Sequence, residues 1–225
     1  GGAERQALTL GGYLIEHKNC EVDILLTSSN NMTSQFKDNL KKNHIKNVLF
    51  FGEPYLTLKR ELTIKNLKRL KWSVQYLLKM RRILKNYEHE VLIPFLNFPS
   101  KLSYYLYKIL PQAKYTFWHQ LGLDTWKFDL VEYVAVKNIP IIIGNAENCF
   151  DVFINNYEMK RKEMFLLPQY LSVQKVNLSP NLLKVKFDIP RNRLVFGMIA
   201  HFAEFKYHSM AYEVFKKINS DFPET

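Results

Sequence analysis

Residues 139–155 read IPIIIGNAENCFDVFIN. The apolar, β-branched run at 139–143 has the length of a strand, and it ends at Gly144-Asn145. A helical spacing of apolar residues follows over 146–155. A fully apolar strand that leads directly into a helix is typical of parallel sheets, because helices cover both faces of such sheets. This segment therefore predicts an α/β fold.

The same alternation runs along the rest of the chain. Further strand-sized runs occur at 22–27, 47–51, 91–96, 114–118, 164–167 and 194–199. Helical patterns occupy 3–17, 34–42, 58–86, 101–110, 126–136 and 208–219. We therefore predict a doubly wound, mainly parallel, Rossmann-like sheet. Gly11-Gly12 inside the first helix predicts a close helix crossing or a break, because each glycine costs roughly 1 kcal/mol relative to alanine there.

One stretch interrupts the alternation. Residues 171–192 contain Pro180 and Pro190 and show no periodicity, so we interpret them as a crossover between domains. Residues 1–170 would form the first domain, and 193–225 would begin a second Rossmann-like domain. Residue 1 is not an initiator methionine, and no strand precedes the first helix. We therefore expect a fragment that lacks the first strand and most of the second domain.

Composition narrows the function classes. The chain has 225 residues, a net charge of +11 and 47% hydrophobic residues, which excludes disorder and favours polyanionic partners such as phosphates, nucleic acid or anionic lipid. No apolar run approaches the roughly 18 residues of a membrane span. Cys20 and Cys149 have no metal-ligand spacing and suit a reducing, cytoplasmic setting.

Two positions suit a phosphate. Gly1-Gly2, followed by Ala3-Glu4-Arg5, opens onto a helix whose unpaired N–H groups favour a phosphate or a sugar hydroxyl. Arg5 would then lie at the cleft, although an ordinary tight turn explains the glycines equally well. Lys206 directly precedes a helix N-terminus, which suits a diphosphate, and the alternative is a solvated surface lysine.

The basic charge is concentrated in one predicted helix. Residues 59–85 contain ten Lys or Arg and a single acidic residue, Glu61. The helical wheel gives a core-facing stripe of Leu67, Leu70, Val74, Leu77 and Leu84. Cations with interleaved aromatic groups on the other side are typical of helices that lie on membranes. The membrane-contacting residues would be Lys65, Lys68, Arg69, Trp72 and Lys79, unless neighbouring elements cover the aromatic groups.

Two strand ends carry further candidates. His119 closes the run at 114–118, and ligands of open α/β sheets bind at the carboxyl ends of strands. Gln120 and Asp124 could orient its ring, and local backbone groups could equally satisfy it. Asn145 also follows a strand, where it could contact a ligand or serve as a turn or helix cap.

Three segments in order resemble the retaining nucleotide-sugar-dependent glycosyltransferases of family 4, which have the two-domain GT-B architecture. They are residues 1–5, residues 144–147 with 164–169, and residues 197–206. The resemblance implies transfer of a hexosyl group, with retention, from a nucleotide-diphosphate sugar to a glycan or lipid-linked acceptor in cell-surface polysaccharide synthesis. It implies no metal or other cofactor, and a cytoplasmic enzyme that is peripheral at the inner face of the membrane.

The resemblance also assigns roles to residues. It places His119 near the donor sugar, and it places His201 and Lys206 on the diphosphate. His201 stands where the family has Arg, Tyr207 where Gly commonly follows the Lys, and Gln169 where Asn is usual. The family's paired-glutamate motif would lie beyond Thr225, so residues 1–225 alone are expected to be inactive.

A second class of function remains open. A non-catalytic basic α/β module could bind anionic lipid or nucleic acid through the same positive charge. The strand–helix alternation and the lack of a recognised nucleic-acid fold signature favour the enzyme, with no nucleic-acid partner. Binding of uridine or guanosine diphosphate would distinguish the two.

Overall fold

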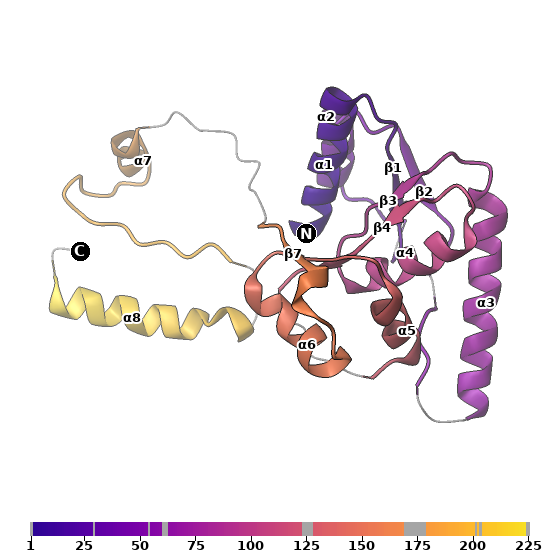
Figure 1. Ribbon diagram of the computed structural model, residues 1–225. Coiled ribbons are helices and arrows are strands. Elements are labelled where there is room, and N and C mark those ends of the chain that lie inside the picture. Colours follow the sequence, from indigo (N-terminus) through magenta and orange to yellow (C-terminus); the bar gives the residue numbers. More distant parts are fainter. Residues whose placement is uncertain are drawn as a thin grey trace. The chain divides into compact units, whose positions relative to one another are not determined.

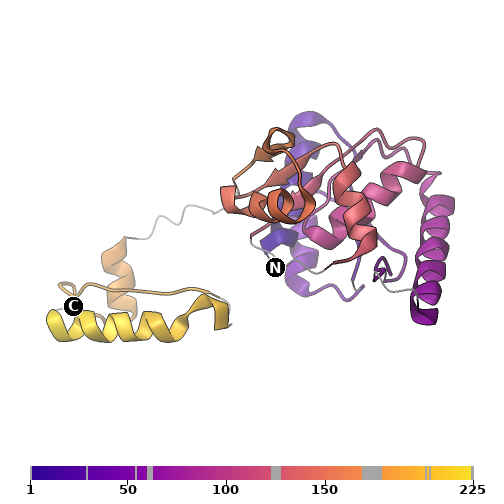
Figure 2. The ribbon, with the colours of Figure 1, turned by 60° about the horizontal axis from the view of Figure 1, so that its bottom comes forward.

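The computed structural model describes residues 2–28, 30–53, 55–59, 63–122, 128–168, 179–200, 202 and 204–223. The chain divides into two compact units, Gly1–Ser172 and Val173–Thr225. Both appear in Figures 1 and 2.

The first unit alternates helices and strands. Its elements are α1 (Gly2–Lys18), β1 (Asp23–Leu26), α2 (Ser34–Lys42), β2 (Asn47–Phe50), α3 (Ile64–Leu84), β3 (Val91–Leu92), α4 (Asn97–Ile109), β4 (Tyr115–Thr116), β5 (Trp118–Gln120), α5 (Leu130–Asn138), β6 (Ile142–Gly144), the 3₁₀ turn η1 (Glu147–Phe150), α6 (Asp151–Tyr157), the 3₁₀ turn η2 (Arg161–Glu163) and β7 (Met164–Leu166). The predicted α/β alternation is therefore present, and the strands are shorter than the apolar runs that predicted them.

Every strand pairing in the described residues is parallel. β1 pairs with β2, β3 with β4, β5 with β6, and β6 with β7. Only Phe117 separates β4 from β5, so these two short strands continue one line. No pairing within the described residues joins β1 to β3. The predicted parallel strands are thus present as three small sheets, β1-β2, β3-β4 and β5-β6-β7, and the last two are linked through β4 and β5.

Helices cover the strands from two sides. Ile24 and Val48 pack with α1 and α2, whereas the next residues, Leu25 and Leu49, pack with α3 and α4 on the opposite face. Trp118 of β5 lies in a core that α4, α5 and α6 share. The sheet is therefore wound on both faces, with α1 and α2 on one and α3 to α6 on the other.

The glycine pair of α1 marks a close crossing. A Cβ on Gly12 would lie 2.5 Å from Oδ1 of Asn43, the residue that ends α2, and one on Gly11 would lie 3.1 Å from Cδ1 of Ile45. A side chain at Gly12 would collide with Asn43, and one at Gly11 would require the Ile45 side chain to shift slightly. The close crossing predicted at Gly11-Gly12 is confirmed, and α1 is continuous through it.

α3 lies at the outer side of the first unit in both views (Figures 1 and 2). The predicted core-facing stripe is wrong in its first half, because Leu67 is 62% exposed and Leu70 and Val74 are also exposed. The buried positions are instead Asn66, Ser73, Met80 and Leu84.

Hydrogen bonds explain this rotation of α3. The Ser73 hydroxyl donates to the carbonyl oxygen of Tyr55, and Asn66 Nδ2 donates to that of Lys59 at 3.0 Å. Loop carbonyls that lie against a helix need donors, so the polar positions of α3 face this loop. The apolar positions Leu67, Leu70 and Val74 consequently point outward.

The second unit is mainly helical in its described part. It contains α7 (Pro180–Lys186), the 3₁₀ turn η3 (Glu204–Lys206) and α8 (His208–Asp221). α7 falls in the stretch 171–192, interpreted from the sequence as a crossover between domains. The predicted strand at 194–199 is wrong, since these residues form no strand. A strand needs a hydrogen-bonded partner, and the described residues of this unit offer none.

Candidate functional site

The parallel strands bring several loops to one edge of the first unit. In parallel strands the carboxyl ends point the same way, and open α/β sheets bind ligands there. Leu92 pairs with Thr116, and Gln120 with Gly144, so residues 93–96, 121–122 and 145 all leave the sheet at this edge. The predicted site residues His119 and Asn145 lie here.

His119 lies within β5 rather than after a strand. The predicted strand at 114–118 is interrupted at Phe117, and pairing with β6 carries the strand to Gln120. The side chain is buried, with 7% of the residue exposed. Its backbone N–H donates to Oγ of Ser100 at 2.9 Å. His119 is therefore held by α4 as well as by the sheet.

The imidazole has a defined tautomer. Nδ1 lies 3.2 Å from the carbonyl oxygen of Pro94, and a carbonyl only accepts, so Nδ1 carries the proton. Nε2 makes no hydrogen bond to any residue that the structure describes. Burial lowers the pKa of His119 below its usual 6.5, and the Pro94 hydrogen bond opposes this only in part. The ring is therefore neutral at pH 7, with Nε2 available as an acceptor.

The loop that supplies this carbonyl has an unusual backbone. Leu96 has φ 79° and ψ 166°, in a region that non-glycine residues rarely adopt. Such a residue costs on the order of 1–3 kcal/mol, and it clusters at functional sites. Its carbonyl oxygen accepts from the Ser100 hydroxyl at 2.8 Å, which also binds the His119 backbone. The strained loop and the histidine thus share one anchor.

The predicted orienting residues do not contact the ring. Gln120 Oε1 accepts from Trp118 Nε1 at 3.2 Å, and Gln120 Nε2 donates to the carbonyl oxygen of Gly122. Asp124 lies outside the described residues. The role expected of Gln120 is therefore filled by Pro94, which the sequence analysis did not identify. Pro94 and His119 are 25 positions apart, so no local pattern relates them.

The hydrogen bonds of Asn145 connect two strand ends. Its Oδ1 accepts from the backbone N–H of Gly122 at 3.0 Å and from the thiol of Cys149 at 3.1 Å. Its own N–H donates to the carbonyl oxygen of Gln120. Asn145 therefore ties the end of β5 to the end of β6, as the turn-forming alternative predicts. Its Nδ2 makes no hydrogen bond to a residue that the structure describes.

The first turn of α1 approaches the same edge. Ala3 and Glu4 line a cavity of about 320 Å³ together with Thr27, Phe95 and Leu96. Gly2 begins α1, and a Cβ there would meet nothing within 4 Å, so packing alone does not require this glycine. Arg5 is exposed on the same turn. Gly1 lies outside the described residues.

The remaining donor-binding candidates lie in the second unit. Lys206 ends η3 and is exposed, and Tyr207, with φ 53°, separates it from α8. Lys206 therefore does precede a long helix. His201 lies outside the described residues.

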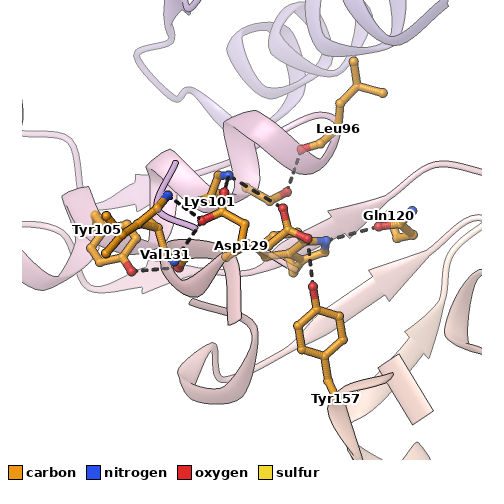
Figure 3. A network of polar contacts seen from close by, with 11 residues as sticks. Leu96, Lys101, Tyr105, Gln120, Asp129, Val131 and Tyr157 are labelled. Carbon is orange, nitrogen blue, oxygen red and sulfur yellow. Dashed lines mark hydrogen bonds and ion pairs between the residues drawn. The ribbon is translucent and has the colours of Figure 1, made fainter. Parts of the chain in front are cut away.

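A buried lysine that the sequence analysis missed occupies the space between α4 and α5 (Figure 3). Nζ of Lys101 lies 2.7 Å from Oδ2 of Asp129 and 3.7 Å from Glu132, and its side chain is 5% exposed. Oδ1 of Asp129 accepts from the backbone N–H groups of Val131 and Leu58, both at 3.0 Å. The charges and donors satisfy one another, so this network is structural.

The network extends to two tyrosines. Tyr157 donates to Glu132 and Tyr105 donates to the carbonyl oxygen of Val131, both at 2.8 Å. Burial is the main cause that raises the pKa of Tyr105, which keeps its hydroxyl protonated as a donor. The tyrosines therefore tie α6 and α4 to the start of α5.

The predicted membrane-contacting residues differ in exposure. Lys65 and Lys68 are exposed, and Trp72 is 53% exposed. Arg69 is half-buried and lies over the Tyr55 ring, 5.9 Å from its centroid. Lys79 is exposed, and its Nζ donates to the carbonyl oxygen of Phe51 at 2.9 Å. Arg69 therefore contributes less free surface than the wheel predicts.

The described ranges offer neither a bilayer-crossing helix nor a cluster of metal ligands. Across the described ranges, no helix combines the length and hydropathy that crossing a bilayer requires. In the same ranges, no three His, Cys, Asp or Glu side chains gather in a way that could hold a metal ion.

Comparison with known proteins bears on the fold. No family model matches the chain, and no curated protein matches it. Among solved structures, it is similar to Anabaena Alr3699/HepE, crystallised in complex with UDP, with a TM-score of 0.64 and 14% sequence identity. The match covers 96% of this chain and 54% of HepE, so the chain spans about half the length of that protein. The α/β fold predicted from the sequence is confirmed.

Proposed function

We propose that the protein carrying this chain is a glycosyltransferase that uses a nucleotide-diphosphate sugar as donor. The observation that carries the proposal is the fold shared with HepE, a protein crystallised with UDP, over 96% of the chain. The segments that resemble the retaining family 4 enzymes support the finer proposal of a GT-B protein that moves a hexosyl group with retention, without a metal. Cell-surface polysaccharide synthesis is the corresponding pathway class.

His119 supports this chemistry by its geometry. A neutral imidazole with the proton on Nδ1 presents Nε2 as an acceptor, which suits a hydroxyl of the donor sugar. The Pro94 carbonyl orients the ring through Nδ1 and Ser100 holds the His119 backbone before ligand arrives, and such preorganisation favours the transition state. We propose that His119 acts on the sugar, while Lys206, Gly2 and the N-terminus of α1 act on the diphosphate, with His201, Gly1, Arg5 and Asn145 as further candidates.

Calorimetric titration of the full protein with UDP and GDP tests the proposal. We expect a dissociation constant between micromolar and millimolar for one of the two nucleotides. Lys206→Ala should weaken this binding by about one to two orders of magnitude, the range for a lost hydrogen bond to a charged group. Binding of neither nucleotide, combined with binding to anionic vesicles or DNA, would instead support the non-catalytic basic module.

Sugar-transfer kinetics test His119 separately. His119→Ala should lower kcat by roughly a hundredfold or more, the range for the loss of one preorganised hydrogen-bonding group, with a smaller change in donor KM. His17→Ala is the matched control, because His17 is exposed on α1 away from the strand ends. Equal kinetics for the two variants would remove His119 from the proposed site.

The outer surface of α3 supports a membrane partner for the same enzyme. We define it by its exposed apolar residues Ile64, Leu67, Leu70, Trp72, Val74 and Leu78 and by its exposed cations Lys65, Lys68, Lys71, Lys79, Arg81 and Arg82. Exposed apolar groups next to cations suit the headgroup region of an anionic bilayer. We propose that the enzyme works at the cytoplasmic face of a membrane on a lipid-linked or glycan acceptor.

A further inference from the structure

The segment from Pro94 to Ser100 contacts His119 at three points. The Pro94 carbonyl oxygen accepts from Nδ1 at 3.2 Å, and the Ser100 hydroxyl accepts from the backbone N–H at 2.9 Å. The third contact is aromatic, because the rings of Phe95 and His119 lie edge to face, with centroids 5.0 Å apart and planes at 76°. The hydrogen bonds account for the His119 backbone and for Nδ1, but they do not account for the aromatic contact.

Core packing does not explain the position of Phe95. In the described part of the chain, the buried apolar side chains form three clusters, and Phe95 packs against none of them. Phe98, three positions later, does pack into the cluster that α3 and α4 share. Phe95 itself is half-buried. Its contact with the imidazole is therefore a feature of the candidate site rather than of the core.

The backbone brings the Phe95 ring and the hydrogen-bond acceptor to the same imidazole. The carbonyl that accepts from Nδ1 belongs to the peptide bond between Pro94 and Phe95, so the acceptor directly adjoins the residue that carries the ring. Leu96, the next residue, has φ 79°, and its carbonyl oxygen accepts from the Ser100 hydroxyl at 2.8 Å. The strained turn at Leu96 is thus held in place by the same side chain that binds the His119 backbone.

Phe95 also lies between the imidazole and open space. Pro94, Phe95 and Leu96 line the cavity of about 320 Å³, whereas His119 contacts Phe95 without lining the cavity. Water at Nδ1 would compete with the Pro94 carbonyl, and a hydrogen bond is stronger where the local dielectric is low. The hydrogen bond of one imidazole nitrogen sets which nitrogen carries the proton. An imidazole open to water would therefore populate both tautomers.

We propose that Phe95 is a positioning residue of the candidate site. Its ring excludes water from the hydrogen bond between Nδ1 and Pro94, and it thereby holds the imidazole in the tautomer that presents Nε2 as an acceptor. A ring with its proton on Nε2 would donate there and could not accept from a sugar hydroxyl. The effect on the imidazole stands by itself, whereas the effect on turnover rests on the proposed action of His119 on the donor sugar.

NMR spectra of the full protein with ¹⁵N-labelled histidine rings test the effect on the imidazole. At pH 8 the rings are neutral, because the usual pKa of histidine is about 6.5. Long-range ¹H–¹⁵N correlations then distinguish the protonated nitrogen from the other one, and His119→Gln identifies the signals of His119. We expect the proton on Nδ1 in the unmodified protein. In Phe95→Ala, the ratio of Nδ1-protonated to Nε2-protonated rings should fall by about tenfold, the upper range for one net hydrogen bond.

Sugar-transfer kinetics of the same proteins test the effect on turnover. In Phe95→Ala, kcat should fall by the same factor as the fraction of Nδ1-protonated rings, with a smaller change in donor KM. Phe95→Tyr keeps an aromatic ring and should restore both the tautomer and kcat. Phe36→Ala is the matched control, because Phe36 is also half-buried but packs in the cluster of α1 and α2. This control should leave the tautomer of His119 unchanged.

An unchanged ratio of tautomers in Phe95→Ala would overturn the proposal, whatever the kinetics, and so would an equal shift in Phe36→Ala. A shifted ratio with unchanged kcat would support the role of Phe95 and contradict the proposed action of His119 on the sugar. If Phe95→Ala does not fold, the unmodified protein decides the question. A resolved Nδ1–H signal, protected from exchange with water, then supports the shielding, and the lack of such a signal overturns it.

Discussion

Replacing Lys101 by methionine should destabilise the first unit strongly. The substitution keeps most of the apolar stem and removes the ammonium group, which lies 2.7 Å from Asp129 in a site where the two side chains are 5% and 11% exposed. Removing one partner of a buried ion pair costs about 3–5 kcal/mol, because the other charge stays buried without compensation. Asp129 keeps two backbone N–H donors, from Leu58 and Val131, so we expect the lower end of the range, about 3 kcal/mol.

Urea unfolding followed by tryptophan fluorescence measures this effect, since Trp118 is buried in the same unit. Lys114→Met is the matched control, because Lys114 pairs with Glu90 where both side chains are more than half exposed. Exposed pairs contribute little, so this variant should leave the unfolding midpoint nearly unchanged.

A double variant isolates the cause. Adding Asp129→Asn to Lys101→Met removes the stranded charge and keeps an oxygen acceptor for both backbone donors. We expect the double variant to be more stable than Lys101→Met alone. The reasoning is refuted if Lys101→Met behaves like Lys114→Met, or if Asp129→Asn lowers the stability of the Lys101→Met protein further.

Three further predictions follow from other sites. Gly12→Ala should lower the free energy of unfolding by about 1–3 kcal/mol through overpacking against Asn43, whereas Gly2→Ala, whose Cβ meets open space, should not, as thermal unfolding of both will show. Stability should fall as the pH drops below about 6.5, because the unfolded chain then binds a proton that buried His119 resists, and urea titrations from pH 7 to 5 should show a weaker fall for His119→Gln. Replacing four exposed α3 cations by glutamine should weaken binding to phosphatidylglycerol vesicles by roughly a thousandfold, at about 1 kcal/mol per cation. Leu67→Asn with Val74→Asn should weaken it too, and unchanged co-sedimentation of both variants would rule out this membrane surface. The four cations are Lys65, Lys68, Lys71 and Lys79.

Local patterns were sufficient to predict most of the first unit. Residues 34–42 form α2 as predicted, and the predicted strand 47–51 differs from β2 by one residue. The signals used, the spacing of apolar residues and the Thr33 N-cap, both act between residues that are close in the sequence. The face of α3 could not be predicted in this way. The buried face of α3 is determined by hydrogen bonds from Ser73 and Asn66 to the loop at 55–59. A helical wheel that considers only apolar residues does not include these hydrogen bonds.

In the candidate site, too, local sequence patterns predict some features, whereas others depend on contacts between distant residues. The position of His119 near the carboxyl edge follows from the apolar run before it, but its partner Pro94 lies in another loop. Lys101 and Asp129 are 28 positions apart, so their pairing depends on how α4 and α5 pack. The run at 194–199 has the composition of a strand, and composition alone does not supply a pairing partner.

The proton on His119 Nδ1 is held by a main-chain carbonyl, and this has a consequence for how the site can change during evolution. A carbonyl is present whichever amino acid occupies position 94, so substitutions there can accumulate without loss of the hydrogen bond as long as the loop keeps its path. A histidine oriented by an aspartate would leave a pair of co-varying positions in an alignment. In such an alignment position 119 would be invariant while position 94 varies. Genetic screens for variants that disturb the His119 hydrogen bond should therefore find changes in loop length rather than point substitutions at position 94.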